Sequence, residues 1–209
     1  MAAKNTIFIR TDDQGECALG EWARDARRAR AAARVVRNDT AGWRFLEGDP
    51  AGAERRDFDD CAWRCVDLPH DFMLEHEFDE HASGGTSLGF LPGGVGWYRK
   101  RLELPFEWRE DRSIRLHFGG IMANGRVYVN GIEVARRPNG YVEQEIDITD
   151  RLRFDGRDLV AVRIDTSDQP ASRWYTGSGI CRDVELVATG TLRVKRGGLF
   201  PHTVFMDGK

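Results

Sequence analysis

Residues 126–135 read RVYVNGIEVA, two short runs of alternating apolar and polar residues joined at Asn130-Gly131. An Asn-Gly pair between such runs is a strong signal for a β-hairpin, because both residues accept positive φ. The same period of two recurs in six further stretches: WYRKRLEL (97–104), SIRLHFGG (113–120), YVEQEIDIT (141–149), DLVAVRID (158–165), DVELVA (183–188) and TLRVKR (191–196). At least eight closely spaced strands with almost no helix between them predict an all-β fold, an antiparallel β-sandwich of the jelly-roll type.

The N-terminal segment differs from the rest of the chain. The stretch WARDARRARAAARVVR (22–37) contains six arginines and six alanines, a composition typical of a helix, and its apolar residues form one stripe. Such a helix is compatible with a basic arm for phosphate or an acidic partner, and with a solvated surface helix, which the net charge favours. We therefore divide the chain into a helical extension (1–41), the sandwich (42–190) and a linker to any following domain (191–209).

The composition is that of a folded protein, with 41% hydrophobic side chains among 209 residues. The 31 Lys and Arg residues against 34 Asp and Glu residues leave a net charge of −3, which argues against a general nucleic-acid-binding protein. No apolar run approaches the roughly 18 residues that span a membrane. The first residues, MAAKNTIFIRTDD, lack the apolar core of a secretory signal. We expect a soluble, cytoplasmic protein without a membrane partner.

Four cysteines are scattered along the chain: Cys17, Cys61, Cys65 and Cys181. Their number and spacing do not suggest the disulfide framework of a small secreted domain. Cys61 and Cys65 are followed by three histidines, but the spacing does not match that of the usual zinc sites. We expect reduced thiols, and neither a metal nor a cofactor.

Two long stretches do not read as strands, VDLPHDFMLEHEFDEHASGGTSLGFLPGGVGW (66–97) and DTSDQPASRWYTGSGICR (165–182). Loops of this length in a compact domain are usually functional or disordered, and their aromatic residues and glycines favour ordered, functional loops. In the second loop, Arg173, Trp174 and Tyr175 are suited to stack on a pyranose and to bind its hydroxyls. The alternative is that Trp174 closes one end of the sandwich while Arg173 pairs with an acid.

Asp71, in the first loop, likewise has one functional and one structural interpretation. Its carboxylate can accept hydrogen bonds from sugar hydroxyls, or it can cap the turn that follows. We find no pair of carboxyl groups that stands out as an acid and a base, no nucleophile elbow and no phosphate-binding loop. The glycine-rich run before Trp97 leads into a strand and reads as a close-packed turn. The residues alone therefore predict no catalytic group.

Five motifs, in this order, resemble the N-terminal sugar-binding domain of glycoside hydrolase family 2, the family of β-galactosidases, β-glucuronidases and β-mannosidases. They are FDDCAWRCVDLPHDF (58–72), GVGWYRKRLELP (94–105), IRLHFGGIMANGRVYVNGIEVA (114–135), NGYVEQEIDITDRL (139–152) and SRWYTGSGICRDVEL (172–186). The resemblance covers residues 42–190, and the LPHD and SRWYTGSGI forms are more similar to the β-galactosidase branch. The arginine-rich helix at 22–37 is a departure from the family pattern.

The resemblance implies a jelly roll followed by an immunoglobulin-like sandwich and a (β/α)₈ barrel that carries both catalytic glutamates of a retaining mechanism. We therefore expect this chain to lack the catalytic glutamates, to be inactive alone, and to act with downstream domains of the same polypeptide. By position, Asp71, Trp97, Arg173, Trp174 and Tyr175 are expected to bind a β-galactoside-like carbohydrate at the rim of the barrel. Two other readings are a freestanding carbohydrate-binding module and a β-sandwich that binds a protein partner. An exposed apolar edge would also allow a homo-oligomer.

Overall fold

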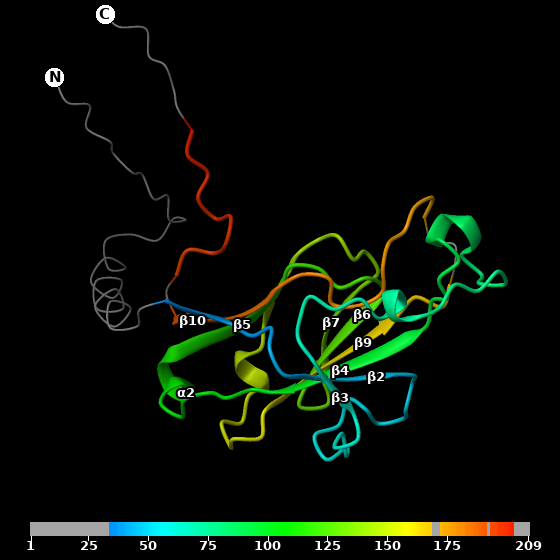
Figure 1. Ribbon diagram of the computed structural model, residues 1–209. Helices are drawn as coiled ribbons and strands as arrows, with labels where there is room; N and C mark the ends of the chain where they lie inside the picture. The colour runs from blue at the N-terminus through cyan, green and yellow to red at the C-terminus, as the bar shows by residue number, and fades with distance from the viewer. Residues whose placement is uncertain (1–33, 169–171, 192, 203–209) are drawn as a thin grey trace, which may run out of the picture.

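The computed structural model describes residues 34–168, 172–191 and 193–202, which form two antiparallel sheets (Figure 1). In the four-stranded sheet the order is β1 (Val35–Asn38), β10 (Val184–Gly190), β5 (Arg112–Phe118) and β8 (Gln144–Asp147). In the six-stranded sheet it is β3 (Arg64–Val66), β2 (Trp43–Glu47), β4 (Val95–Arg101), β9 (Leu159–Asp165), β6 (Gly125–Val129) and β7 (Ile132–Arg137). Helical structure in the described ranges is limited to the short turns η1 (Phe72–Glu75), η2 (Gly85–Leu88), α2 (Trp108–Asp111) and η3 (Thr149–Arg151). The predicted antiparallel β-sandwich is confirmed.

The hairpin predicted at residues 126–135 is present. Strands β6 and β7 pair, and the turn residues Asn130 and Gly131 have φ values of 53° and 86°. The Asn130 side chain donates to Asp158 Oδ1 at 2.7 Å and accepts from the Leu159 amide at 3.0 Å. These bonds fasten the turn to the start of β9, which pairs with β6 on its other side.

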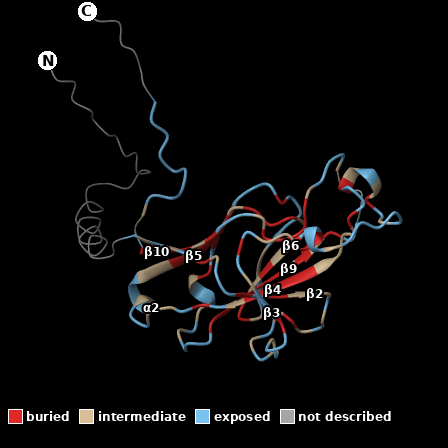
Figure 2. Cartoon of the chain, viewed as in Figure 1, coloured by how far each residue is buried: buried red, intermediate tan, exposed pale blue. Residues whose placement is uncertain are grey.

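The core lies between the two sheets, where alternate residues of neighbouring strands meet. One cluster contains Ile114, Leu116 and Phe118 of β5 together with Val160 and Val162 of β9, all at most 1% exposed. Figure 2 shows this burial in strands of both sheets, while the connections between them are largely exposed. The alternation read from the sequence therefore selects the inward faces correctly.

The segment between β2 and β3 covers the outer face of the six-stranded sheet, and Arg99 of β4 lies beneath it with no exposed side-chain area. Its guanidinium donates to Asp60 Oδ2 at 2.8 Å and to the carbonyl oxygens of Ala53, Arg55 and Phe58. A buried guanidinium costs free energy unless its donors are bonded, and here they bind the covering segment. Arg99 thus holds this segment against the sheet.

Replacing Arg99 with alanine should lower the free energy of unfolding by about 3 kcal/mol, because Asp60 and the loop carbonyls lose their donor. Urea unfolding followed by circular dichroism measures this loss. Arg101→Ala removes an exposed arginine from the same strand and should change stability by less than about 0.5 kcal/mol. Equal losses in the two variants would contradict the anchoring role of Arg99.

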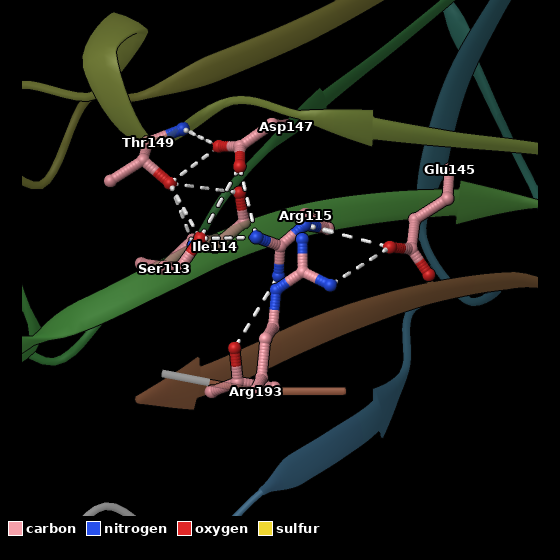
Figure 3. Close-up of polar contacts among 8 residues, drawn as sticks. Ser113, Ile114, Arg115, Glu145, Asp147, Thr149 and Arg193 are labelled. Carbon is pink, nitrogen blue, oxygen red and sulfur yellow. Dashed lines mark hydrogen bonds and ion pairs between the residues drawn. The ribbon is translucent and has the colours of Figure 1, made fainter. Parts of the chain in front are cut away.

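The outer face of the four-stranded sheet is charged and partly covered (Figure 3). Arg115 of β5 contacts Asp147 at 3.0 Å and Glu145 at 3.5 Å, and Arg193 lies 3.9 Å from the same Glu145. Beside them, Arg196 lies 3.4 Å from Glu143. The C-terminal segment therefore rests on this sheet through ion pairs. The strand predicted for 191–196 is wrong over 193–196, where the chain makes no sheet pairing.

At the other end of the chain, residues 35–38 form the edge strand β1, with Val36 opposite Val187 of β10. The helix predicted over 22–37 is therefore wrong for residues 35–37, and the rest of that helix except Arg34 lies outside the described residues. Val35 packs against the core and Val36 is β-branched, so pairing with β10 outweighs the helical composition of the preceding residues. The four-stranded sheet accordingly includes residues that precede the expected boundary at 42.

Candidate functional site

The described parts of the two long loops predicted to be functional lie side by side. The amide of His70 donates to the Ile180 carbonyl at 2.9 Å, and the amide of Phe72 donates to the Ser178 carbonyl at 2.9 Å. The LPHD motif therefore runs along the TGSGI motif, although about one hundred residues separate them in sequence. Long-range backbone pairing brings together the residues that the sequence could only treat as two separate loops.

Asp71 is the centre of this contact. Its Oδ1 accepts from the amides of Met73 at 3.1 Å and Ser178 at 2.8 Å, and its Oδ2 accepts from the Tyr175 hydroxyl at 2.6 Å. The first bond caps η1, while the other two reach across to the second loop. Burial and the adjacent Asp71 carboxylate together raise the pKa of Tyr175, so its hydroxyl keeps its proton and remains a donor.

Two glycines allow the loops to approach this closely. Gly177 has φ 78°, and a Cβ at this position would lie 2.6 Å from Asp71 Oδ2. A Cβ at Gly179 would collide with the carbonyl oxygen of His70. The glycines of the TGSGI motif are therefore required by backbone packing against His70 and Asp71.

A second polar chain runs beneath Asp71 into the core. The Tyr98 hydroxyl lies 2.6 Å from His70 Nδ1, and His70 Nε2 lies 3.1 Å from Glu75 Oε1. Burial and the charge of Asp71 raise the pKa of Tyr98, so its hydroxyl keeps its proton and can donate it to His70 Nδ1. A carboxylate can only accept, so His70 Nε2 is the donor to Glu75. Neither His70 nor Tyr98 was among the predicted site residues; their only signals in the sequence are the LPHD motif and the inward register of Tyr98.

Trp174 and Tyr141 form the exposed part of the site. The Trp174 indole is 61% exposed, the Tyr141 side chain is 49% exposed, and Trp174 Nε1 donates to the Tyr141 hydroxyl at 3.1 Å. Both border a hollow of about 530 Å³, within the range of small-ligand sites. Polar residues also line the hollow: Asn124, Asn139, Asp165, Thr166, Asp168, Ser172, Arg173 and Thr176. Tyr141 lies in the connection between β7 and β8 and was not among the predicted site residues.

The predicted site residues fall into two places. Asp71 and Tyr175 bond each other, and Arg173 and Trp174 line the adjacent hollow. Trp97 is 3% exposed and lies in a separate cluster on the outer face of the six-stranded sheet, stacked on Tyr128. Its Nε1 donates to Asp49 at 2.9 Å. The structure therefore does not bring Trp97 together with the other four.

The family model "Glycosyl hydrolases family 2, sugar binding domain" matches residues 91–190. Residues 91–190 are a sugar-binding domain of glycosyl hydrolase family 2. The beta-galactosidase BoGH2A of Bacteroides ovatus is 41% identical over 169 residues, which cover 81% of this chain and 20% of that protein. A putative beta-glucuronidase of Formosa agariphila is 30% identical over 175 residues, covering 84% of this chain and 16% of that protein.

Solved structures of the family have the same fold. A beta-glycosidase from Bacteroides vulgatus superposes with a TM-score of 0.71 at 35% identity, covering 75% of this chain and 20% of that chain. A beta-glucuronidase of Bacteroides uniformis gives a TM-score of 0.68 at 30% identity, covering 79% of this chain and 19% of that chain. The chain thus spans about a fifth of the length of these family 2 proteins.

The described ranges also bear on metals, thiols and membranes. Within residues 34–168, 172–191 and 193–202, no three His, Cys, Asp or Glu side chains are grouped as a metal site. Cys61, Cys65 and Cys181 are free thiols, and Cys17 lies outside the described residues. None of the helices described has the length and apolar character needed to cross a bilayer.

Removing the Asp71 carboxylate should loosen the second loop. In Asp71→Ala the Ser178 amide loses its acceptor, and its hydrogen exchange should accelerate about tenfold, equivalent to about 1.4 kcal/mol. Tyr175→Phe keeps both backbone bonds of Asp71 and should have a smaller effect on Ser178. Amide exchange measured by NMR tests this, and an unchanged Ser178 rate in Asp71→Ala would show that the loop is held by other contacts.

The ion pair of Asp49 with Arg163, next to Trp97, should make stability pH-dependent. Arg163 hydrogen-bonds Asp49 and, against desolvation, lowers the pKa of its carboxyl to about 2, with further help from Trp97. A depressed folded-state pKa adds stability that is present above the unfolded value near 4 and is lost as pH falls toward 2. Asp49→Asn should therefore show a smaller drop in Tm between pH 5 and pH 2 than the unmodified chain.

Thermal unfolding followed by circular dichroism at the two pH values measures this difference. Glu110→Gln, which removes an exposed carboxyl group in α2, serves as the control and should keep the original drop in Tm. An Asp49→Asn profile parallel to that of the unmodified chain would show that the ion pair with Arg163 does not contribute to acid stability.

Proposed function

We propose that this chain provides the sugar-binding domain of a retaining family 2 glycosidase of the β-galactosidase branch, with the jelly-roll connectivity typical of that domain. In this proposal the loop at 172–176 lies at the rim of an active site supplied by further domains of a longer, cytoplasmic polypeptide. The family match of residues 91–190 supports the sugar-binding role. The names of the relatives include both beta-galactosidases and beta-glucuronidases, so the preference for galactosides rests on the chemistry of the hollow.

The observation that carries the proposal is the exposure of Trp174 at the edge of a polar hollow. An indole that is 61% exposed leaves a large apolar surface in water, and the loop that carries it is fixed through Tyr175 and Asp71. A pyranose has C–H groups on its faces and hydroxyls around its rim, so it matches an aromatic face surrounded by amide, hydroxyl and carboxyl groups. The site is therefore suited to a sugar ring.

The charges of the hollow favour a neutral sugar. Two carboxylates line it, Asp165 and Asp168, against one guanidinium, that of Arg173. Arg163, which does not line the hollow, lies 3.1 Å from Asp165 and offsets part of the negative charge of that carboxylate. In this hollow the carboxylate of a glucuronide would gain no net electrostatic attraction, because the positive charges do not exceed the negative ones. A galactoside carries no charge and therefore meets no repulsion. This supports the β-galactosidase branch.

The bonding of Asp71 argues against a proton-transfer role for this carboxylate. Retaining glycosidases use two carboxyl groups about 5 Å apart, one of which must exchange protons with the substrate. Asp71 already accepts from two backbone amides and from the Tyr175 hydroxyl, so both of its carboxylate oxygens are engaged within the protein. Asp71 is therefore a positioning residue in this proposal, and the catalytic carboxyl groups belong to the other domains.

Sugar binding by the chain tests the proposal. We expect methyl β-galactoside to bind with a millimolar Kd, about −4 kcal/mol, and methyl β-glucuronide to bind more weakly. NMR chemical-shift titration measures both. Trp174→Ala should weaken galactoside binding about tenfold, whereas Phe106→Ala, which removes an aromatic residue of similar exposure (64%) near α2, should have no effect. Tighter binding of the glucuronide, or an unchanged Kd in Trp174→Ala, would contradict the proposal.

A further inference from the structure

We propose that the hollow beside Trp174 holds two linked pyranose units, one on the Trp174 indole and the next on the Tyr141 ring. The substrate class implied is a neutral β-linked oligosaccharide, not a simple galactoside. This inference rests on the proposed function, since it extends the same sugar-binding surface by one unit. Nothing in the sequence or in the family match assigns a role to Tyr141.

The two rings are arranged so that their polar edges meet. Trp174 Nε1 donates to the Tyr141 hydroxyl at 3.1 Å, so each ring uses its polar group on the other. The remaining exposed surface is therefore mainly the apolar part of the two rings. Two adjacent aromatic rings, each about half exposed or more, provide a longer stacking surface than one pyranose covers.

Tyr141 is held in place by its backbone. Its amide donates to Asn139 Oδ1 at 2.8 Å, and its carbonyl accepts from Arg182 Nη1 at 3.4 Å. The preceding Gly140 packs so closely that a Cβ there would lie 2.6 Å from Met122 Sδ. Met122 in turn exchanges two backbone bonds with Gly179, at 2.8 and 2.7 Å. Tyr141 is thus anchored to the same backbone as the Asp71 contact, which lowers the entropy cost of binding.

The polar residues of the hollow lie beside both rings. Ser172, Arg173 and Thr176 flank Trp174 in sequence, while Asn139 precedes Tyr141. Asn124 donates its amide to the Asp165 carbonyl at 2.9 Å, which leaves its Oδ1 as an acceptor. A hollow of about 530 Å³ with hydroxyl-binding groups next to each ring suits two sugar units in succession.

A simpler role for Tyr141 would be to support Trp174 through its hydroxyl. The two roles differ in which part of Tyr141 matters. Support requires the hydroxyl and affects every ligand of Trp174, whereas stacking requires the ring and affects only ligands long enough to reach it. Tyr141→Phe and Tyr141→Ala separate them, because the first removes only the hydroxyl and the second removes the ring as well.

The experiment compares a linear β-linked galactotriose with methyl β-galactoside on the 209-residue chain, by NMR titration. We expect the trisaccharide to bind at least tenfold more tightly. Tyr141→Ala should abolish this advantage, because the trisaccharide should lose at least tenfold more affinity than methyl β-galactoside does, and Tyr141→Phe should keep most of the advantage. Unfolding midpoints of the variants, measured in parallel, confirm that each is folded.

Three results would overturn the inference without overturning the proposed function. Equal affinity of the two sugars for the unmodified chain would leave the proposed function intact but exclude the second unit. An equal loss for both sugars in Tyr141→Ala would show that Tyr141 only supports Trp174. A full trisaccharide advantage in folded Tyr141→Ala would place the second unit elsewhere. Failure of both sugars to bind the unmodified chain would instead overturn the proposed function together with this extension.

Discussion

The candidate site depends on the carboxylate of Asp71, which joins two loops that lie about one hundred residues apart in the chain. It accepts one bond within its own loop, from Met73, and two from the other, through Ser178 and Tyr175. Charge-assisted bonds of this kind are stronger than neutral ones, and here they set the position of the segment that carries Trp174. The position of the exposed Trp174 is thus determined by bonds that Trp174 itself does not make.

The core of the sandwich supports the Asp71 contact through the neighbouring residue His70. Tyr98 lies in strand β4, packs in the core, and its hydroxyl lies 2.6 Å from His70 Nδ1. His70 and Asp71 are adjacent in sequence. His70 contacts Tyr98 of the core and Asp71 bonds Tyr175 of the second loop, so this dipeptide links the second loop to the core. A site held on rigid strands keeps its geometry better than one on loops alone, which suits a domain whose role is to position a sugar.

The alternation of apolar and polar residues predicted most strands of the two sheets, but it failed near the two ends of the sandwich sequence. Alternation identified the inward faces of β4 and β5, the stretch at 158–165 was predicted as a strand, and the Asn130-Gly131 turn was confirmed. It failed at residues 35–37, where β-branched residues follow a helical composition, and at 193–196, where an alternating segment binds the sheet surface through arginines. In both cases tertiary contacts outweigh the secondary structure that the local residues favour. The spacing of apolar residues does not show which strand pairs at the sheet edge or which side chains form ion pairs.

For the site, motifs of consecutive residues were enough to predict the family, the aromatic loop at 173–175 and the position of Asp71 beside a turn. Folding adds what these motifs do not contain: the bond between Asp71 and Tyr175, the contact of Tyr141 with Trp174, and the burial of Trp97 on the opposite side of its sheet. These outcomes depend on strand register and on which loops meet at the end of the sandwich. Register and loop contact arise from long-range pairing, which no local stretch of residues specifies.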